Sequence, residues 1–206
     1  MAGTQKTDTQ MPNTLKHCAV LALGSNLGES EDTLEHAVAD LVAGGVRLVR
    51  ASGLYRTAPV GGPEGQPDFV NAVIEVTTDL GAYELLRLCN AVEAAHHRER
   101  LVRWGPRTLD IDVIDYDGVI SEDPVLTLPH PRAQERAFVL VPWAQMDPQA
   151  RLTVTHRAKP SGERPDEVPE PLSREVVNVA ELSRTLLGAD EDAISYMREM
   201  QVPDQP

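Results

Sequence analysis

Four arginines stand shortly before two aspartates in the middle of the chain. The arginines are Arg98, Arg100, Arg103 and Arg107. Residues 108–116 (TLDIDVIDY) follow them, have the composition of a strand, and carry Asp110 and Asp112. Side chains alternate between the two faces of a strand. The two carboxylates are therefore expected on one face, with the apolar neighbours in this segment on the other.

Carboxylates and arginines in this arrangement match the chemistry of phosphate transfer. Mg²⁺ prefers one or two carboxylates together with phosphate oxygens, and the guanidinium fork fits phosphate oxygens. A lone Asp-x-Asp is common at strand ends, and a run of arginines is usually a solvated helix face. The combined segment RWGPRTLDID is more specific, because Gly105-Pro106 breaks any helix and places Trp104 and Arg107 on a loop beside the strand. These residues predict a polyphosphate-transfer site.

The composition limits what else the protein does. Its 206 residues fit one domain with a tail or an insertion. The formal net charge of -13 argues against a general binder of nucleic acid or anionic membranes, since such proteins present basic patches. Two cysteines, Cys18 and Cys89, support neither a disulfide framework nor a zinc site. Without a membrane-length apolar segment or a signal-peptide core, the expected location is a reducing cytoplasm.

Hydrophobic patterning predicts the elements that must position this site. Strands are expected at residues 17–23, 46–55, 69–77 and 108–116, and helices at residues 30–43 (capped by Ser30), 83–97, 132–139 and 176–187. The first six elements follow the order strand–helix–strand–strand–helix–strand of the ferredoxin-like fold. We therefore expect an α+β sandwich, a βαββαβ antiparallel sheet with helices packed on one face and C-terminal additions. Asp117-Gly118, after the fourth strand, is a hairpin signal.

The remaining segments are predicted to be loops and additions. Residues 1–16 are polar and without periodicity, which predicts a disordered extension before the domain at residues 17–154. Residues 155–175 are charged and rich in proline, which predicts an exposed insertion before a C-terminal helix and tail at residues 176–206. Residues 56–68 hold three prolines and three glycines, and we interpret them as a lid over the site.

Four separate motifs resemble one enzyme family. They are RWGPRTLDID at 103–112, ALGSNLG at 22–28, YRT at 55–57 with QPDFVN at 66–71, and LPHP at 128–131 with RAF at 136–138. Over roughly residues 20–146 the chain resembles the 6-hydroxymethyl-7,8-dihydropterin pyrophosphokinases. The resemblance implies transfer of pyrophosphate from ATP to the hydroxymethyl group of the pterin, in folate biosynthesis. It implies these two small molecules as partners, without nucleic acid or membrane, and we favour a monomer.

The resemblance also implies a role for each matching residue. Asp110 and Asp112 would hold two Mg²⁺ ions that bridge the ATP phosphates, and Arg98 and Arg107 would neutralise charge at the transferred β-phosphoryl group. The residues implied to contact ATP are Asn90, Glu93, Arg100, Arg103, Trp104, Val113, Thr127, His130 and Arg136. Those implied to contact the pterin are Thr57, Ala58, Val60, Phe69, Asn71 and Phe138. The two phenylalanines, the only ones in the chain, would sandwich the pterin ring.

Three features depart from the family pattern. In the pterin loop, Ala58 stands where the family usually has proline, and Phe69 where it often has tyrosine. His96-His97 stand before Arg98, where a glycine is more usual. The insertion after Thr155 has no counterpart in short members of the family. None of these departures removes a chemical group that the mechanism requires.

Two other functions compete with this interpretation. A Mg-dependent nucleotidyltransferase also combines Gly-Ser with Asp-x-Asp, but its two motifs usually lie close together, whereas Gly24-Ser25 is far from Asp110. A non-catalytic phosphate-binding module would use the arginines alone. Asp110 and Asp112 would then repel the phosphate unless a metal ion intervened.

Overall fold

The computed structural model describes residues 16–59, 63, 65–96, 106–156, 172–188 and 194–202. Almost all of the predicted N-terminal extension, and residues 157–171 of the predicted insertion, lie outside these residues. No helix within the described ranges is both long and apolar enough to cross a membrane.

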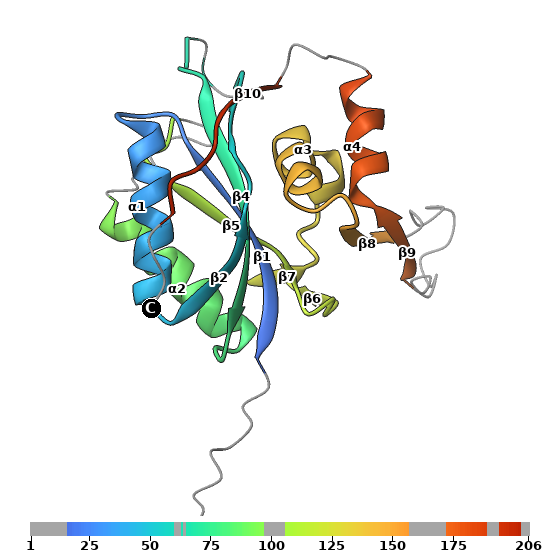
Figure 1. Cartoon of the computed structure of the whole chain (residues 1–206). Coiled ribbons are helices and arrows are strands. Elements are labelled where there is room, and N and C mark those ends of the chain that lie inside the picture. The colour runs from blue at the N-terminus through green and yellow to red at the C-terminus, as the bar shows by residue number, and fades with distance from the viewer. Residues whose placement is uncertain are drawn as a thin grey trace, which may run out of the picture.

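A six-stranded antiparallel sheet forms the centre of the molecule (Figure 1). Its strands are β1 (His17–Ser25), β2 (Val46–Ala51), β3 (Leu54–Thr57), β4 (Phe69–Thr78), β5 (Asp110–Tyr116) and β10 (Ile194–Arg198). The strand order is β10-β3-β4-β1-β5, and β2 also pairs with β4. Strand β1 therefore lies in the middle of the sheet, between β4 and β5, and β5 forms one edge.

Helices cover both faces of this sheet (Figure 1). Helices α1 (Ser30–Ala43) and α2 (Ala82–Ala95) pack on one face, and α3 (Ala137–Met146) and α4 (Val179–Leu187) lie on the other. A hairpin of β8 (Arg151–His156) and β9 (Ser173–Asn178) accompanies α4, and β6 (Ser121–Asp123) pairs with β7 (Leu126–Leu128). The predicted α+β sandwich is confirmed, and its C-terminal additions supply the layer opposite α1 and α2.

The apolar run of β1 is explained by burial on both sides of the sheet. Leu21 and Leu23 are at most 2% exposed and belong to the core cluster under α1 and α2. Val20 and Ala22 belong to the second cluster, together with α3, α4 and β8. A strand that is buried on both faces reads as a continuous hydrophobic run instead of alternating with polar residues.

Three details of the sequence interpretation are wrong. The predicted strand 46–55 is two strands, because Ser52 leaves the ladder and exchanges hydrogen bonds with Val73, both through its backbone N–H and through its hydroxyl. Glu29 occupies the N-cap position of helix α1, without a side-chain hydrogen bond, and Ser30 is the first residue of the helix. The predicted helix 132–139 is a 3₁₀ turn at Ala133–Glu135 followed by α3, since Arg136 between them is extended.

The boundaries expected for the insertion fall within regular structure. Thr155 and His156 complete β8, and Ser173 to Glu175 begin β9, in register with them. Both strands are short, and β9 is largely exposed and carries no apolar alternation strong enough to reveal it. Helix α4 accordingly begins at Val179, with the side chain of Asn178 accepting a hydrogen bond from the Glu181 amide.

The turn at Asp117-Gly118 forms as predicted, but the strand after it has another partner. Both residues have positive φ, 51° and 64°, as a mirror-image turn requires, and the Val119 amide donates to the Tyr116 carbonyl across it at 2.9 Å. The next strand, β6, then pairs with β7 and not with β5. Asp115 supports this turn, since its Oδ1 accepts from the Gly118 amide at 3.1 Å.

Replacing Asp115 tests the electrostatics of this turn. Burial raises the pKa of the Asp115 carboxyl, Asp117 raises it further, and the Gly118 amide partly opposes them. A carboxyl whose folded pKa lies above its unfolded value of about 3.9 favours folding only while it is protonated. Asp115→Asn keeps the acceptor and removes the charge, so the variant should be more stable than the wild type at about pH 7. Urea unfolding should show this advantage disappear at about pH 3; an advantage of equal size at both pH values would contradict the assignment.

Candidate active site

The candidate site is built on one row of residues across the sheet. Asp110 in β5 lies opposite Gly24 in β1, Gly24 lies opposite Asn71 in β4, and Asn71 lies opposite Tyr55 in β3. Residues that face one another across antiparallel strands point to the same side of the sheet. The row therefore carries Asp110 and Asn71 on one face, with a residue lacking a side chain between them.

Gly24 keeps this part of the sheet open. A Cβ atom at this position would lie 3.1 Å from Asn71 Oδ1 and 3.9 Å from the ring of Phe69. The first of these contacts is tighter than packing normally allows, so any side chain here would have to displace the amide of Asn71. The glycine of the motif ALGSNLG thus leaves free the surface between the two groups of predicted ligand-binding residues.

Each of the two aspartates is held by one of the predicted phosphate-binding arginines. Arg107 forms an ion pair with Asp110, and Arg136 Nη1 donates to Asp112 Oδ2 at 2.7 Å. The four side chains are between 21% and 33% exposed, so the pairs face solvent while resting on the sheet. Charge-assisted pairs in such positions are well defined and still accessible to a ligand.

His130 approaches the same carboxylate as a neutral ring. Its Nε2 lies 3.8 Å from Asp112 Oδ2, and its Nδ1 accepts from the Arg132 amide at 3.2 Å. Since Nδ1 is an acceptor, the ring proton lies on Nε2. Burial lowers the pKa of His130, and the opposing effect of Asp112 and Asp110, itself partly cancelled by Arg136 and Arg132, does not overcome it. His130 can therefore donate one hydrogen bond from Nε2 without a change of protonation.

Two of the predicted pterin residues form a buried polar pair, and Phe69 lies beside it. Asn71 Nδ2 donates to Thr57 Oγ1 at 2.9 Å, and the two residues are only 5% and 7% exposed. Phe69 lies opposite Thr57 in the β3–β4 pairing. Phe138, near the start of α3, packs on the second core cluster, and the guanidinium of Arg136 lies 5.4 Å from its ring centroid. Both phenylalanines are only partly buried, so ring surface remains accessible.

Asn26 connects three loops of the site and was missed by the sequence interpretation. Its Oδ1 accepts from the Arg107 amide at 2.7 Å, and its own amide donates to the Arg107 carbonyl at 3.0 Å. Its Nδ2 donates to the Pro67 carbonyl at 3.1 Å, two residues before Phe69. Asn26 is 3% exposed, so these bonds are shielded from water. Asn26 lies within the motif ALGSNLG, which contributed to the family resemblance without a role being assigned to this residue.

Glu93 joins α2 to the start of β5. The side chain is 4% exposed, and its Oε1 accepts from the Ile111 amide at 2.7 Å. Because β5 is an edge strand, this amide points away from β1 and needs a partner outside the sheet. Asn90, one turn earlier, is exposed. Glu93 therefore fixes the strand that carries Asp110 and Asp112.

The other residues predicted to contact ligands differ in accessibility. Val113 is 5% exposed and belongs to the core under α1 and α2, and Thr127 Oγ1 donates to the Asp123 carbonyl at 3.0 Å. Val113 and Thr127 would therefore contact a bound ligand through their backbone atoms. Ala58 follows β3 directly. Val60, Arg98, Arg100, Arg103 and Trp104 lie outside the described residues.

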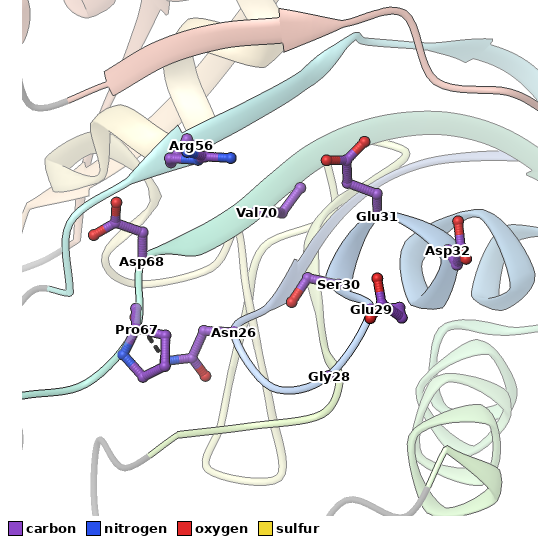
Figure 2. A pocket seen from close by; sticks show the side chains of 10 residues that line it. All are labelled: Asn26, Gly28, Glu29, Ser30, Glu31, Asp32, Arg56, Pro67, Asp68 and Val70. Atoms are coloured by element: carbon purple, nitrogen blue, oxygen red, sulfur yellow. Dashed lines mark hydrogen bonds between the residues drawn. The ribbon is translucent and has the colours of Figure 1, made fainter.

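A cavity of about 470 Å³ lies beside this site, on the other face of the sheet. Figure 2 shows Arg56 and Asp68 at one side of it and Glu31 and Asp32 on helix α1 at the other. Arg56 alternates with Thr57 along β3, which places it on the face opposite to the pterin residues. With Glu29 as a fourth acidic residue in the lining, the cavity carries more acidic than basic side chains. None of the predicted ligand-binding residues lines it.

The carboxylates of β5 suit a magnesium ion that takes its remaining ligands from water and substrate. They do not suit a metal ion that is enclosed by side chains alone. Within the described ranges, no group of three His, Cys, Asp or Glu side chains could enclose a metal ion. Asp110 and Asp112 alone offer hard oxygen ligands on one face of a strand, and arginines stand beside them. Mg²⁺ commonly takes one or two carboxylates and completes its octahedron with water and substrate phosphates. The donor set thus fits this ion.

Comparison with known proteins identifies relatives of this chain. The family model described as 7,8-dihydro-6-hydroxymethylpterin-pyrophosphokinase (HPPK) matches residues 20–148. A 2-amino-4-hydroxy-6-hydroxymethyldihydropteridine pyrophosphokinase of Methylorubrum extorquens is 47% identical over 131 residues, covering 63% of this chain and 82% of that relative. Its namesake in Mycobacterium leprae is 43% identical over 179 residues, covering 81% of this chain and 91% of the relative.

Solved structures agree with the fold. A Plasmodium falciparum HPPK-DHPS variant crystallised with pteroate superimposes with a TM-score of 0.58 at 12% sequence identity. The match covers 90% of this chain and 47% of that longer chain, so the present chain spans about half its length. At this identity the likeness supports the arrangement of helices and strands and says nothing of individual residues.

Substitutions of Glu93 test how β5 is fixed. Glu93→Leu removes the acceptor and leaves the Ile111 amide buried without its partner, so it should lower the free energy of unfolding by about 1–3 kcal/mol. Glu93→Gln keeps a carbonyl acceptor and should be the milder of the two. Urea unfolding followed by circular dichroism measures both. Equal losses for Leu and Gln would show that the hydrogen bond does not anchor the strand.

Proposed function

The chain belongs to the 7,8-dihydro-6-hydroxymethylpterin-pyrophosphokinase family, and from this premise we propose how its own residues carry the reaction. The enzyme is an ATP-dependent pyrophosphokinase of folate biosynthesis, and its acceptor is 6-hydroxymethyl-7,8-dihydropterin. We place it in the cytoplasm, where unpaired thiols such as those of Cys18 and Cys89 persist.

The reaction requires position and charge control more than covalent chemistry. The pterin hydroxyl oxygen forms a bond to the β-phosphorus of ATP, the bond between the β-phosphorus and the oxygen bridging it to the α-phosphorus breaks, and AMP leaves with that oxygen. Transfer of phosphoryl groups depends on in-line placement and on neutralising charge on the phosphate oxygens. The observation that carries the proposal is the single row that sets Asp110 and Asn71 on one face, at either side of Gly24.

We assign metal binding to Asp110 and Asp112. When bound there, two Mg²⁺ ions would supply positive charge to the phosphate chain and so reduce the repulsion of the attacking hydroxyl. The two carboxylates fit this role because they share a face and remain partly exposed. Glu93 holds the backbone between them in place.

The arginines that pair with these carboxylates are assigned to the phosphates. Arg107 and Arg136 neutralise Asp110 and Asp112 in the structure, and each guanidinium has further N–H groups to donate. When nucleotide and metal bind together, each guanidinium can stay beside its carboxylate and donate its remaining N–H groups to phosphate oxygens. Arg98 acts with Arg107 at the transferred group, on the strength of the family motif, and Arg100, Arg103 and Trp104 complete the nucleotide side. His130 donates from Nε2 beside them.

The pterin is assigned to the pair Thr57 and Asn71. Since the Asn71 amide nitrogen already donates to Thr57, its oxygen stays available as an acceptor, and the threonine hydroxyl proton stays available for donation. A pterin edge offers donors and acceptors side by side, which matches this pair. Phe69 and Phe138 would stack on the ring, with the backbone of Ala58 and Val60 completing the pocket.

The nucleotide product distinguishes the reaction classes. With Mg–ATP and 6-hydroxymethyl-7,8-dihydropterin, attack at the β-phosphorus gives AMP and a pterin diphosphate. We expect pterin-dependent AMP, abolished by EDTA, when the products are separated by anion-exchange chromatography. ADP would indicate attack at the γ-phosphorus, pyrophosphate would indicate nucleotidyl transfer, and either as the main product would refute the proposal.

Substitution of the two aspartates tests the metal assignment. Asp110→Asn and Asp112→Asn should each lower kcat by about two to four orders of magnitude, because loss of a metal's charge removes several kcal/mol of transition-state stabilisation. Asp115→Asn, on the same strand and supporting only the turn, is the matched control and should keep normal turnover. Circular dichroism confirms that each variant is folded. Near-normal turnover of either site variant would exclude that residue as a ligand.

A further inference from the structure

The C-terminal strand β10 lies beyond the part of the chain that matches the family model. That match ends at residue 148, whereas β10 spans Ile194–Arg198 and forms the outermost strand next to β3. In Figure 1 the red C-terminal segment runs along the edge of the sheet and then alongside α1. Strand β3 has only four residues and is followed directly by the Pro/Gly-rich segment 58–68. Without β10, this short strand would be an edge.

Strand β10 extends the rows of residues that carry the pterin site. Tyr196 lies opposite Tyr55, so the row through Asn71 and Gly24 begins at the C-terminal strand. Ile194 lies opposite Thr57, which in turn lies opposite Phe69. The two rows that hold the proposed pterin residues therefore both end on β10.

Helix α1 holds β10 by a two-carboxylate clamp on Arg198. Arg198 Nε donates to Glu31 Oε2 at 2.7 Å, and its Nη1 donates to Glu35 Oε1 at 2.6 Å. Glu31 and Glu35 lie one helical turn apart on the same side of α1, which sets their carboxylates at the spacing of the guanidinium fork. The Gln201 backbone amide also donates to the Glu35 side chain. Met200, which lies between Arg198 and Gln201 in the sequence, is 8% exposed and belongs to the core.

Strand β10 packs closely against residues at the start of β3 and just before it. A Cβ atom on Gly53 would lie 2.5 Å from Tyr196 Cε2 and 3.0 Å from the Arg198 carbonyl oxygen. Tyr196 also meets the buried ring of Tyr55 edge-on, with ring centroids 5.5 Å apart. Only glycine at position 53 permits this approach.

We propose that β10 is a strap that holds β3 in place for pterin binding, with Arg198 as its positioning residue. The proposal rests on the assignment of Thr57 and Asn71 to the pterin. An edge strand of four residues opens easily, and β10 gives it a second hydrogen-bonded neighbour. The metal and phosphate side of the site stands on β5, at the opposite edge, and does not depend on this strap. Loss of the clamp should therefore affect one substrate and spare the other.

The test separates the two substrates in steady-state kinetics on the full chain. Arg198→Ala should raise KM for 6-hydroxymethyl-7,8-dihydropterin by about fivefold or more, a typical size for coupling between linked sites, and leave KM for Mg–ATP and kcat within about twofold. Arg198→Lys keeps the charge and loses the fork, so its KM should fall between wild type and alanine. Arg184→Ala, in the exposed face of α4, is the matched control and should behave as wild type.

A second readout follows the strand itself. Hydrogen–deuterium exchange of the peptide covering β3 should be faster in Arg198→Ala, and also in Gly53→Ala, whose Cβ displaces Tyr196 and the Arg198 carbonyl but removes no side chain of the clamp. If the pterin KM is unchanged and β3 stays protected in both variants, the strap is refuted. Equal rises of KM for both substrates would likewise overturn it, because they would indicate a general loss of structure.

Asn71→Leu, measured in parallel, separates this proposal from the pterin assignment. A raised pterin KM for Asn71→Leu with a normal value for Arg198→Ala would refute the strap and support the assignment of Asn71 to the pterin. An unchanged pterin KM for Asn71→Leu would refute the pterin assignment, and with it the strap proposal that rests on it. A raised pterin KM for both, with lysine intermediate at position 198, is the expected result.

Discussion

The pairing of β1 with β4 and β5 around Gly24 determines where every group of the site lies. Because side chains alternate along a strand, a slip of one residue would turn Asp110 and Asp112 into the core under α1 and α2 and would move the leucines of β1 to the opposite face of the sheet. The two core clusters prevent this slip, since Leu21 and Leu23 fill one and Val20 and Ala22 fill the other. The hydrophobic effect thus fixes the register, and the register places the polar groups. The site inherits its geometry from apolar packing to which its charged and polar residues do not belong.

Charge is distributed on this framework so that the ligand-free site is locally balanced. The chain as a whole has a formal net charge of -13, yet the described face of β5 pairs each aspartate with an arginine. The acidic cavity at the start of α1 lies on the opposite face of the sheet, away from the two arginine–aspartate pairs. Asn26 adds a further constraint, because it holds the backbone of Arg107 at two points and reaches the Pro67 carbonyl with its amide. The arginines that could meet a polyanion therefore stand on the face of the sheet that carries the candidate site.

The local sequence pattern was sufficient to predict those elements that depend on residues close together in the sequence. The alternation of residues 108–116 predicted which face of β5 carries Asp110 and Asp112, and apolar periodicity predicted α1, α2 and the central strands. The errors arose where distant contacts decide. Ser52 divides a predicted single strand because Val73 offers it two hydrogen bonds, and β10 exists because Glu31 and Glu35 bind an arginine more than 160 residues later. No short window of sequence contains both partners of such contacts. Asn26 was overlooked for the same reason, since two of its partners lie in other loops.

The two edges of the sheet divide the work of the enzyme, and each edge is stabilised from outside. At one edge, Glu93 of α2 accepts the free amide of Ile111 and fixes the strand of the carboxylates. At the other, β10 covers β3 and is fixed to α1 through Arg198. Transfer between two bound substrates depends on the distance and angle between them, and a misplacement of about 1 Å can cost about a hundredfold in rate. That distance is set by the strands between the edges. An open edge at β10 would loosen the pterin contacts carried by β3 while the strands between still set this distance, so a firm edge matters to pterin binding as much as the ligand-binding groups themselves.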